Sequence, residues 1–135
     1  MLNVKKKNIL FNINRNLKFI LIHLNIMEKF KNNLSTLRIL SCCSKKTRGK
    51  ILKSSKKELI RAINECILNT LNGNIKLSPI QKKILEKHKY ILRKLINNKF
   101  IGTKKKILIQ KGGFLQFILP SAITLISSIL ENLKK

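Results

Sequence analysis

The chain has 135 residues, and its 30 lysines and arginines against five acidic residues give a net charge of +25. Its length indicates one domain, and the scattered glutamates, with no aspartate, argue against a paired-carboxylate active site. An excess of this size attracts polyanions, of which nucleic acid is the commonest and an anionic membrane the second candidate.

Residues 1–33 form a basic segment that is rich in asparagine and lysine. We expect this segment to be poorly ordered. Met27 offers a second start of translation, in which case residues 1–26 would not be translated. A helix through residues 9–32 is compatible with the composition, but no function is expected from it.

The next stretch, within residues 34–57, alternates short apolar and basic runs. Leu34 to Leu40 predicts one or two helical turns, and Lys45 to Lys57 predicts a basic, partly helical connector. Three cysteines without a Cys-x-x-Cys motif make a metal site improbable, and Cys66 is expected to be a small buried residue on a helix.

Two helices with clear boundaries follow. Ser55-Lys56-Lys57-Glu58 has the pattern of a capping box and predicts a helix over about 55–72, which Gly73 ends in a left-handed conformation. Ser78-Pro79-Ile80-Gln81 repeats the capping pattern and predicts a helix over about 78–98. The apolar stripes of the two helices are expected to face each other, which predicts a small all-α hairpin.

The C-terminal part changes from basic to apolar. Thr103 to Gln110 predicts a short helix or strand that Thr103 caps, with Ile107 to Ile109 packed on the hairpin. Residues 112–130 contain no charge, and Pro120 predicts a kink in an apolar helix. This tail is about long enough to span a bilayer, so the sequence leaves open a membrane span or a buried helix.

Basic side chains cluster in the middle region, residues 34–111, which carries most of the charge. Lysine binds phosphate as a point charge, and no aromatic residues are interleaved with the basic patches, so non-specific contact with double-stranded DNA is expected. The candidate nucleic-acid-binding residues are Lys45, Lys46, Arg48, Lys50, Lys53, Lys82, Lys83, Lys87, Lys89, Arg93, Lys94, Lys104, Lys105 and Lys106.

The junction at residues 110–114 resembles a known arrangement. A basic segment (Lys104-Lys105-Lys106), the sequence Gln110-Lys111-Gly112-Gly113 and an apolar segment that reaches Pro120 are similar to adenovirus core protein X, the precursor of peptide mu. The resemblance covers residues 101–135. The helix-Asn-Gly-Asn-helix layout upstream resembles small basic proteins of Polinton (Maverick) elements and adintoviruses. Adenovirus protein X is rich in arginine, whereas this chain is rich in lysine.

The resemblance implies a candidate processing site, made of Gln110, Lys111, Gly112, Gly113 and Phe114, at which an adenovirus-type cysteine protease would cut before Phe114. It also implies a non-enzymatic virion core or minor capsid protein that is found in virions and the host nucleus. The domain organisation is then a basic segment (1–33), a basic helical region (34–111) and an apolar tail (112–135), whose residues 114–133 contact capsid or membrane. No cofactor and no metal are expected. The alternatives are a tail-anchored or membrane-active protein of an intracellular membrane and a decayed fragment of an element.

Overall fold

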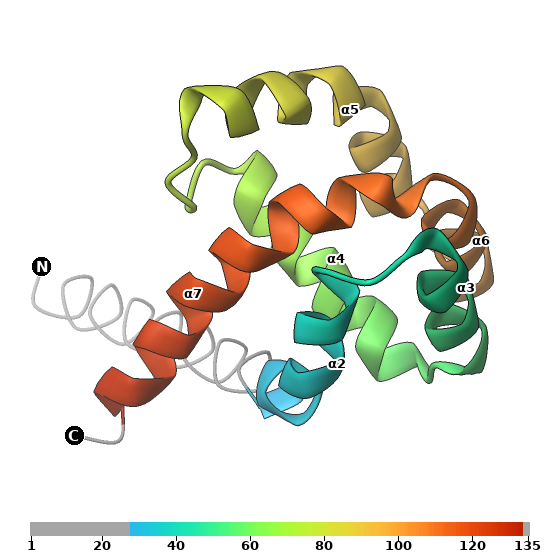
Figure 1. Ribbon diagram of the computed structural model, residues 1–135, viewed down its shortest axis with the longest axis horizontal. Coiled ribbons are helices and arrows are strands. Elements are labelled where there is room, and N and C mark those ends of the chain that lie inside the picture. Colours follow the sequence, from blue (N-terminus) through green and yellow to red (C-terminus); the bar gives the residue numbers. More distant parts are fainter. Residues whose placement is uncertain (1–27, 134–135) are drawn as a thin grey trace, which may run out of the picture.

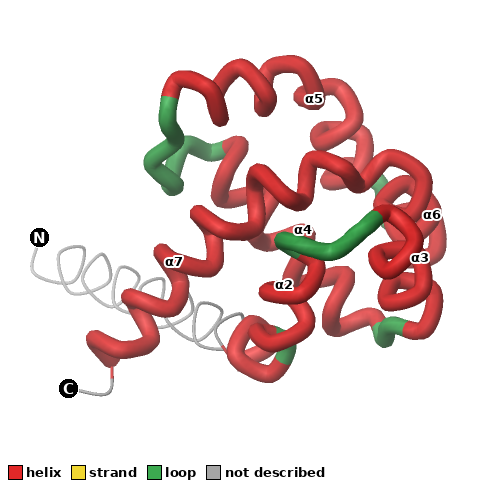
Figure 2. Tube along the Cα trace, in the orientation of Figure 1, coloured by secondary structure: helices red, strands yellow, loops and turns green. Residues whose placement is uncertain are grey.

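The protein is all-α over residues 28–133, the part that the computed structural model describes (Figure 1). The expectations for residues 1–27, including the second start, lie outside the described residues. A helical segment at residues 28–32 precedes the first labelled helix. The elements are α2 (Leu34–Leu40), α3 (Lys45–Ser54), α4 (Lys57–Leu71), α5 (Pro79–Asn97), α6 (Ile101–Lys111), the 3-10 turn η1 (Gly112–Phe114) and α7 (Leu115–Leu133). Short loops join them (Figure 2).

The boundaries of α5 follow the predicted chemistry closely. The Ser78 hydroxyl accepts from the Gln81 amide at 3.2 Å, and the Gln81 side chain accepts from the Ser78 amide at 2.9 Å. This reciprocal pair satisfies two amide groups that the first helical turn leaves without intrahelical partners. At the end of α4, Gly73 has φ of +76°, which confirms the left-handed stop.

The capping box predicted at Ser55 is wrong. The preceding connector is a full helix, α3, which Ser44 caps by accepting from the Thr47 amide at 3.2 Å. Ser55 is therefore the C-cap of α3, and its hydroxyl donates to the Leu52 carbonyl at 2.7 Å. Lys56 is the N-cap of α4 and makes no side-chain cap bond.

The element predicted at Thr103 to Gln110 is a helix, and it begins earlier than expected. Phe100 is the N-cap of α6, without a side-chain cap bond, so Thr103 lies inside the helix. The Phe100 amide donates to the Asn98 side chain at 3.0 Å, a local bond that ends α5 and turns the chain into α6. Leu108 is fully buried, and its neighbours Ile107 and Ile109 are partly buried. This confirms that the stretch packs on the core.

The apolar tail is the central helix of the fold. α7 packs against α2, α4 and α5, and in Figure 1 it passes across α4. α4 and α5 do touch each other, but both also bury apolar side chains against α7, so the predicted two-helix hairpin is incomplete without it. The described part of the tail, residues 112–133, therefore contributes to the same core as the basic helices: Leu115, Leu119 and Ala122 are fully buried.

The chain turns sharply between α6 and α7 at η1, and α7 itself bends along its length (Figure 2). Pro120 lies inside α7, where its ring nitrogen has no hydrogen to donate to the carbonyl four residues before, a known cause of helix bending. The predicted kink is confirmed. The sharper change of direction, however, is at the glycine pair.

Candidate nucleic-acid interface

The outer face of α5 carries exposed bases along its whole length. Lys82, Lys83, Lys87, Arg93 and Lys94 are exposed, whereas Leu92 and Leu95 on the opposite face are fully buried. The spacing of helical residues puts all five bases on one side of the helix. The exposed Glu86 lies among them on the same side, so this face carries five positive charges and one negative charge.

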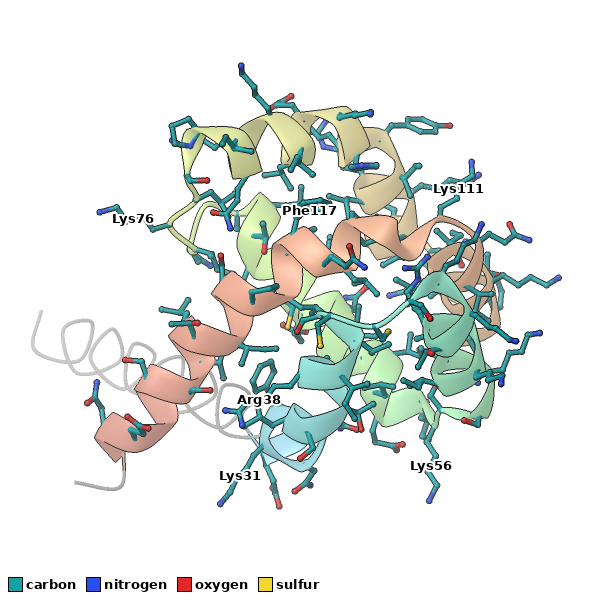
Figure 3. The ribbon with its side chains drawn as sticks, in the orientation of Figure 1. Lys31, Arg38, Lys56, Lys76, Lys111 and Phe117 are labelled. Atoms are coloured by element: carbon teal, nitrogen blue, oxygen red, sulfur yellow. The ribbon has the colours of Figure 1, made fainter. Side chains whose placement is uncertain are left out.

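A second group of exposed bases lies on α3 and α6, which pack against each other, with α6 also touching α5 (Figure 1). Lys45, Lys46, Lys50, Lys53 and Lys106 are exposed there. Figure 3 also shows Lys31, Lys56, Lys76 and Lys111 pointing away from the body at different edges. The positive charge therefore surrounds the described molecule and is not confined to one face.

Arg48 does not belong to this interface. Its side chain is only 4% exposed, and its Nε has no hydrogen-bond partner within the described structure. It lies against the glycine pair, since a Cβ placed on Gly112 would be 3.2 Å from Arg48 Nε. The prediction of Arg48 as a phosphate ligand is thus corrected: it is a packing residue between α3 and η1.

Lys104 and Lys105 are already engaged within the fold. Lys104 Nζ donates to Asn64 Oδ1 at 2.8 Å, which joins α6 to α4. Lys105 Nζ donates to the carbonyls of Lys53 at 3.1 Å and Ser55 at 2.8 Å, at the end of α3. A cation at this position satisfies carbonyls that lack intrahelical partners. Of the predicted trio 104–106, only Lys106 is exposed on the outer surface and free of such a bond.

One further candidate, Lys89, is half-buried and forms an ion pair with a carboxylate. Lys89 Nζ lies 3.2 Å from Glu86 Oε1, the sole ion pair within the described residues. The remaining exposed bases there have no acidic partner within contact distance. They would therefore lose little internal stabilisation on meeting phosphate.

Exposed aromatic residues accompany the basic surfaces, contrary to the prediction of no interleaving. Tyr90 on α5 is 79% exposed and lies on the same outer face as Lys83, Lys87 and Lys94. Phe100, at the start of α6, is 74% exposed. Their positions three or four residues from a base are visible in the sequence, but their exposure depends on which side of each helix meets the core.

The candidate processing site adopts a helical conformation. Gly112 to Phe114 form a 3-10 turn in which Gly112 is buried and Phe114 is only 1% exposed. The Phe114 ring lies 6.0 Å from the ring of the half-buried His88, centroid to centroid. Gln110, Lys111 and Gly113 are exposed. The candidate cleavage bond therefore joins an exposed residue, Gly113, to a buried one, Phe114, within this turn.

Burial decides the properties of the cysteine on α4. Cys66 is fully buried, as predicted, and burial raises the pKa of its thiol to about 12, an effect that the charge of Glu65 reinforces. A thiol of this kind stays protonated and unreactive at neutral pH. Within residues 28–133, no group of three or more histidine, cysteine or acidic side chains is placed to hold a metal ion.

The fold and the exposed bases together define a small, strongly basic helical protein. Within the described residues, one helical stretch, Ile101–Ser128, which comprises α6, η1 and most of α7, is long and apolar enough to cross a membrane by length and composition, with 44% of its apolar 18-residue window buried in the fold. No protein family, curated protein or solved structure matches the chain.

Proposed function

We propose that the protein is a non-enzymatic core or minor capsid protein of an adenovirus-like mobile element, which binds packaged double-stranded DNA without reading its sequence. The observation that supports this proposal most strongly is the set of exposed bases on α5, α3 and α6, almost none of which has an acidic partner. Such bases neutralise phosphates and release counterions, the source of non-specific affinity. We place the protein in the virion and the host nucleus.

Bases on separate sides of the molecule also favour bridging of DNA segments. The α5 face and the α3–α6 surface are carried by different parts of the fold (Figure 1). A compact cation of this kind can contact one duplex with each surface, which reduces the repulsion between neighbouring duplexes. Lysines suit this role because a point charge has no preferred base or groove geometry.

The test is binding of the full chain to two duplexes of unrelated sequence over a range of salt concentrations. Eight phosphate contacts would give a slope of about −7 for the logarithm of affinity against the logarithm of salt. We expect equal affinity for the two duplexes and loss of binding near 0.5 M salt, on the order expected for such a slope. Strong binding at that salt, or none at about 50 mM, would contradict the proposal.

Charge-removing variants make the test specific to the surfaces. Changing Lys82, Lys83, Lys87 and Lys94 to Gln should make the salt slope shallower by up to about 0.9 for each phosphate that is no longer neutralised. A matched pair in α6 serves as control: Lys106→Gln removes an exposed charge, whereas Lys105→Gln removes one that is bonded to carbonyls. If the two single variants weaken DNA binding equally, only net charge matters and no particular surface is involved.

Maturation by an adenovirus-type cysteine protease is part of the proposal. Because Phe114 is buried in a 3-10 turn, we expect slow cleavage of the folded chain and fast cleavage in mild denaturant. The measurement is the N-terminal sequence of the released fragment, which should begin at Phe114. A chain that stays intact under both conditions removes protease processing from the proposal.

A membrane-active or tail-anchored protein is the second candidate, and the Ile101–Ser128 stretch is the observation that favours it. The same stretch contributes Leu115, Ile118 and Leu119 to the core, so insertion into a bilayer would open the fold. We expect the tail to contact a capsid surface instead, through its exposed side near Phe117 and Thr124. Association with vesicles that resists carbonate would favour the membrane candidate.

A further inference from the structure

A cavity lies between the segment before α2, helix α4 and helix α6, apart from the exposed basic faces. Its volume is about 120 Å³, and charged and polar side chains from all three elements line it: Lys29, Arg61, Asn64, Glu65 and Lys104, with Phe30 as the apolar floor. A single water needs only roughly 10–15 Å³ of such space. The cavity thus has room for a polyatomic ion of several heavy atoms.

The charges that line the cavity do not cancel. Lys29, Arg61 and Lys104 carry three positive charges against the one negative charge of Glu65, an excess of two. None of the three cations lies within 4.0 Å of the Glu65 carboxylate, because the sole ion pair in the described chain is Lys89–Glu86. The basic groups therefore surround the cavity without a direct acidic partner, and an anion inside it would be attracted by all three.

Lys104 is held in place at the cavity wall and is partly removed from water, whereas Arg61 is exposed and Lys29 half-buried. The bond from Lys104 Nζ to Asn64 Oδ1, at 2.8 Å, fixes the ammonium at the cavity wall. Burial lowers the pKa of Lys104; the charge of Arg61 adds to this, while that of Glu65 opposes it. Burial likewise raises the pKa of Glu65, and Lys104 and Lys29 only partly offset the rise. A bound anion would relieve the repulsion between Lys104 and Arg61.

We propose that this cavity is a binding site for a phosphate group, either inorganic phosphate or the terminal monoester of a larger molecule, with Arg61, Lys104 and Lys29 as its cationic ligands. Arg61 presents a planar fork of N–H donors that matches two phosphate oxygens. Lys104 and Lys29 contribute point charges from neighbouring elements. Glu65 limits the affinity for the dianion, so the site is tuned to bind and release it. The site is separate from the α5 face and does not depend on DNA binding there.

The test is titration of the isotope-labelled full chain with inorganic phosphate at constant ionic strength, followed by NMR of its backbone amides. We expect saturable shifts confined to residues 29, 61–65 and 104. Arg61→Gln should weaken the binding about tenfold, the loss expected for one charge-assisted bond. Lys76→Gln is the matched control: it removes an equal charge from an exposed position in the loop between α4 and α5, outside the candidate DNA-binding residues, and should leave the binding unchanged.

Two further experiments test the role of Glu65 and the source of the phosphate group. Glu65→Gln removes the repulsive carboxylate and should tighten phosphate binding several-fold, which a merely structural Glu65 would not do. An oligonucleotide with a 5′-phosphate, compared with the same one without it, separates a terminal monoester from free phosphate as the source. Shifts that never saturate and spread over all lysines, or equal weakening by Arg61→Gln and Lys76→Gln, would overturn the proposal.

Discussion

The contact between Gly112 and Arg48 leaves little room for a side chain at residue 112. Arg48 is buried, and a Cβ on Gly112 would lie 3.2 Å from its Nε and 3.4 Å from its Cδ. Gly113, the next residue, has open space where its Cβ would be. The two glycines are therefore not equivalent, although the sequence presents them as a pair.

Replacing each glycine by alanine should show the difference between the crowded Gly112 and the open Gly113. Gly112→Ala forces a methyl group against a packed side chain, which we expect to destabilise the fold by about 1–2 kcal/mol. Gly113→Ala meets no atom within 4 Å and should be neutral or stabilising by about 0.5 kcal/mol, because it restricts the unfolded chain. Urea unfolding measures both. In an Arg48→Ala background the cost of Gly112→Ala should largely vanish; an undiminished cost would mean that Arg48 is not its cause.

Glu65 gives a pH dependence whose sign can be worked out. Burial raises the pKa of this carboxyl above its ordinary value of 4.5, so the folded state binds the proton more tightly than the unfolded state. Stability contributed by Glu65 therefore falls as pH rises through the interval between the two values. Glutamine does not titrate, so Glu65→Gln should raise the free energy of unfolding at pH 7. The difference in stability from the unchanged protein should shrink towards pH 4, where Glu65 becomes protonated.

The control for this prediction is Glu86→Gln. Glu86 forms the surface ion pair with Lys89, so its replacement should be neutral or cost up to about 0.5 kcal/mol at pH 7, as for exposed pairs on helices. Thermal unfolding at several pH values measures both variants. Equal destabilisation of the two variants at pH 7 would show that the charged Glu65 is not penalised by burial.

At the scale of the elements, local chemistry predicted α5 well and α4 less well. The capping box at Ser78 and the left-handed Gly73 need only neighbouring residues, so the sequence contains all the information. Ser55 has the same local pattern, but α3 extends to Ser54 and occupies the preceding turn. The sequence of α3 predicts only a partly helical connector, because its many lysines obscure the pattern of the few apolar residues that pack on α6. Competition between adjacent helices is not visible in a four-residue pattern.

The two serines therefore make a direct comparison. Ser78→Ala removes the acceptor of the Gln81 amide and should cost about 1 kcal/mol, the usual value for loss of an N-cap. Ser55→Ala removes only a hydroxyl donated to the Leu52 carbonyl, which still accepts from the Ser55 amide at 3.3 Å. We expect its cost to stay below about 0.5 kcal/mol. Denaturant midpoints measure both; a larger cost at Ser55 would favour a capping role there after all.

At the scale of the whole molecule, the sequence predicted the change from basic to apolar at residue 112 but left open whether the tail is a membrane span or a buried helix. In the fold, the basic region and the tail share one core. The charged helices α4 and α5 each have only a narrow apolar stripe, and α7 supplies the additional apolar surface that covers both stripes. The same long-range packing buries Arg48 and engages Lys104 and Lys105, so this part of the candidate interface could not be predicted from composition.

This shared core predicts that the tail is required for folding. Deleting residues 114–135 removes Phe114, Leu115 and Leu119, which are at most 1% exposed, and uncovers the apolar faces of α2, α4 and α5. We expect residues 1–113 to lose cooperative thermal unfolding while keeping some helix, as circular dichroism would show.

Point variants in α7 test the same dependence without deleting chain. Leu119→Ala should cost about 2–5 kcal/mol, as for a fully buried leucine, whereas Phe117→Ala, at a 43% exposed position, should cost less than about 1 kcal/mol. A truncated chain that still unfolds cooperatively would make the tail an appendage. If instead it unfolds, cleavage before Phe114 followed by loss of the tail would convert a compact cation into an extended one, which can follow a DNA duplex over a longer distance.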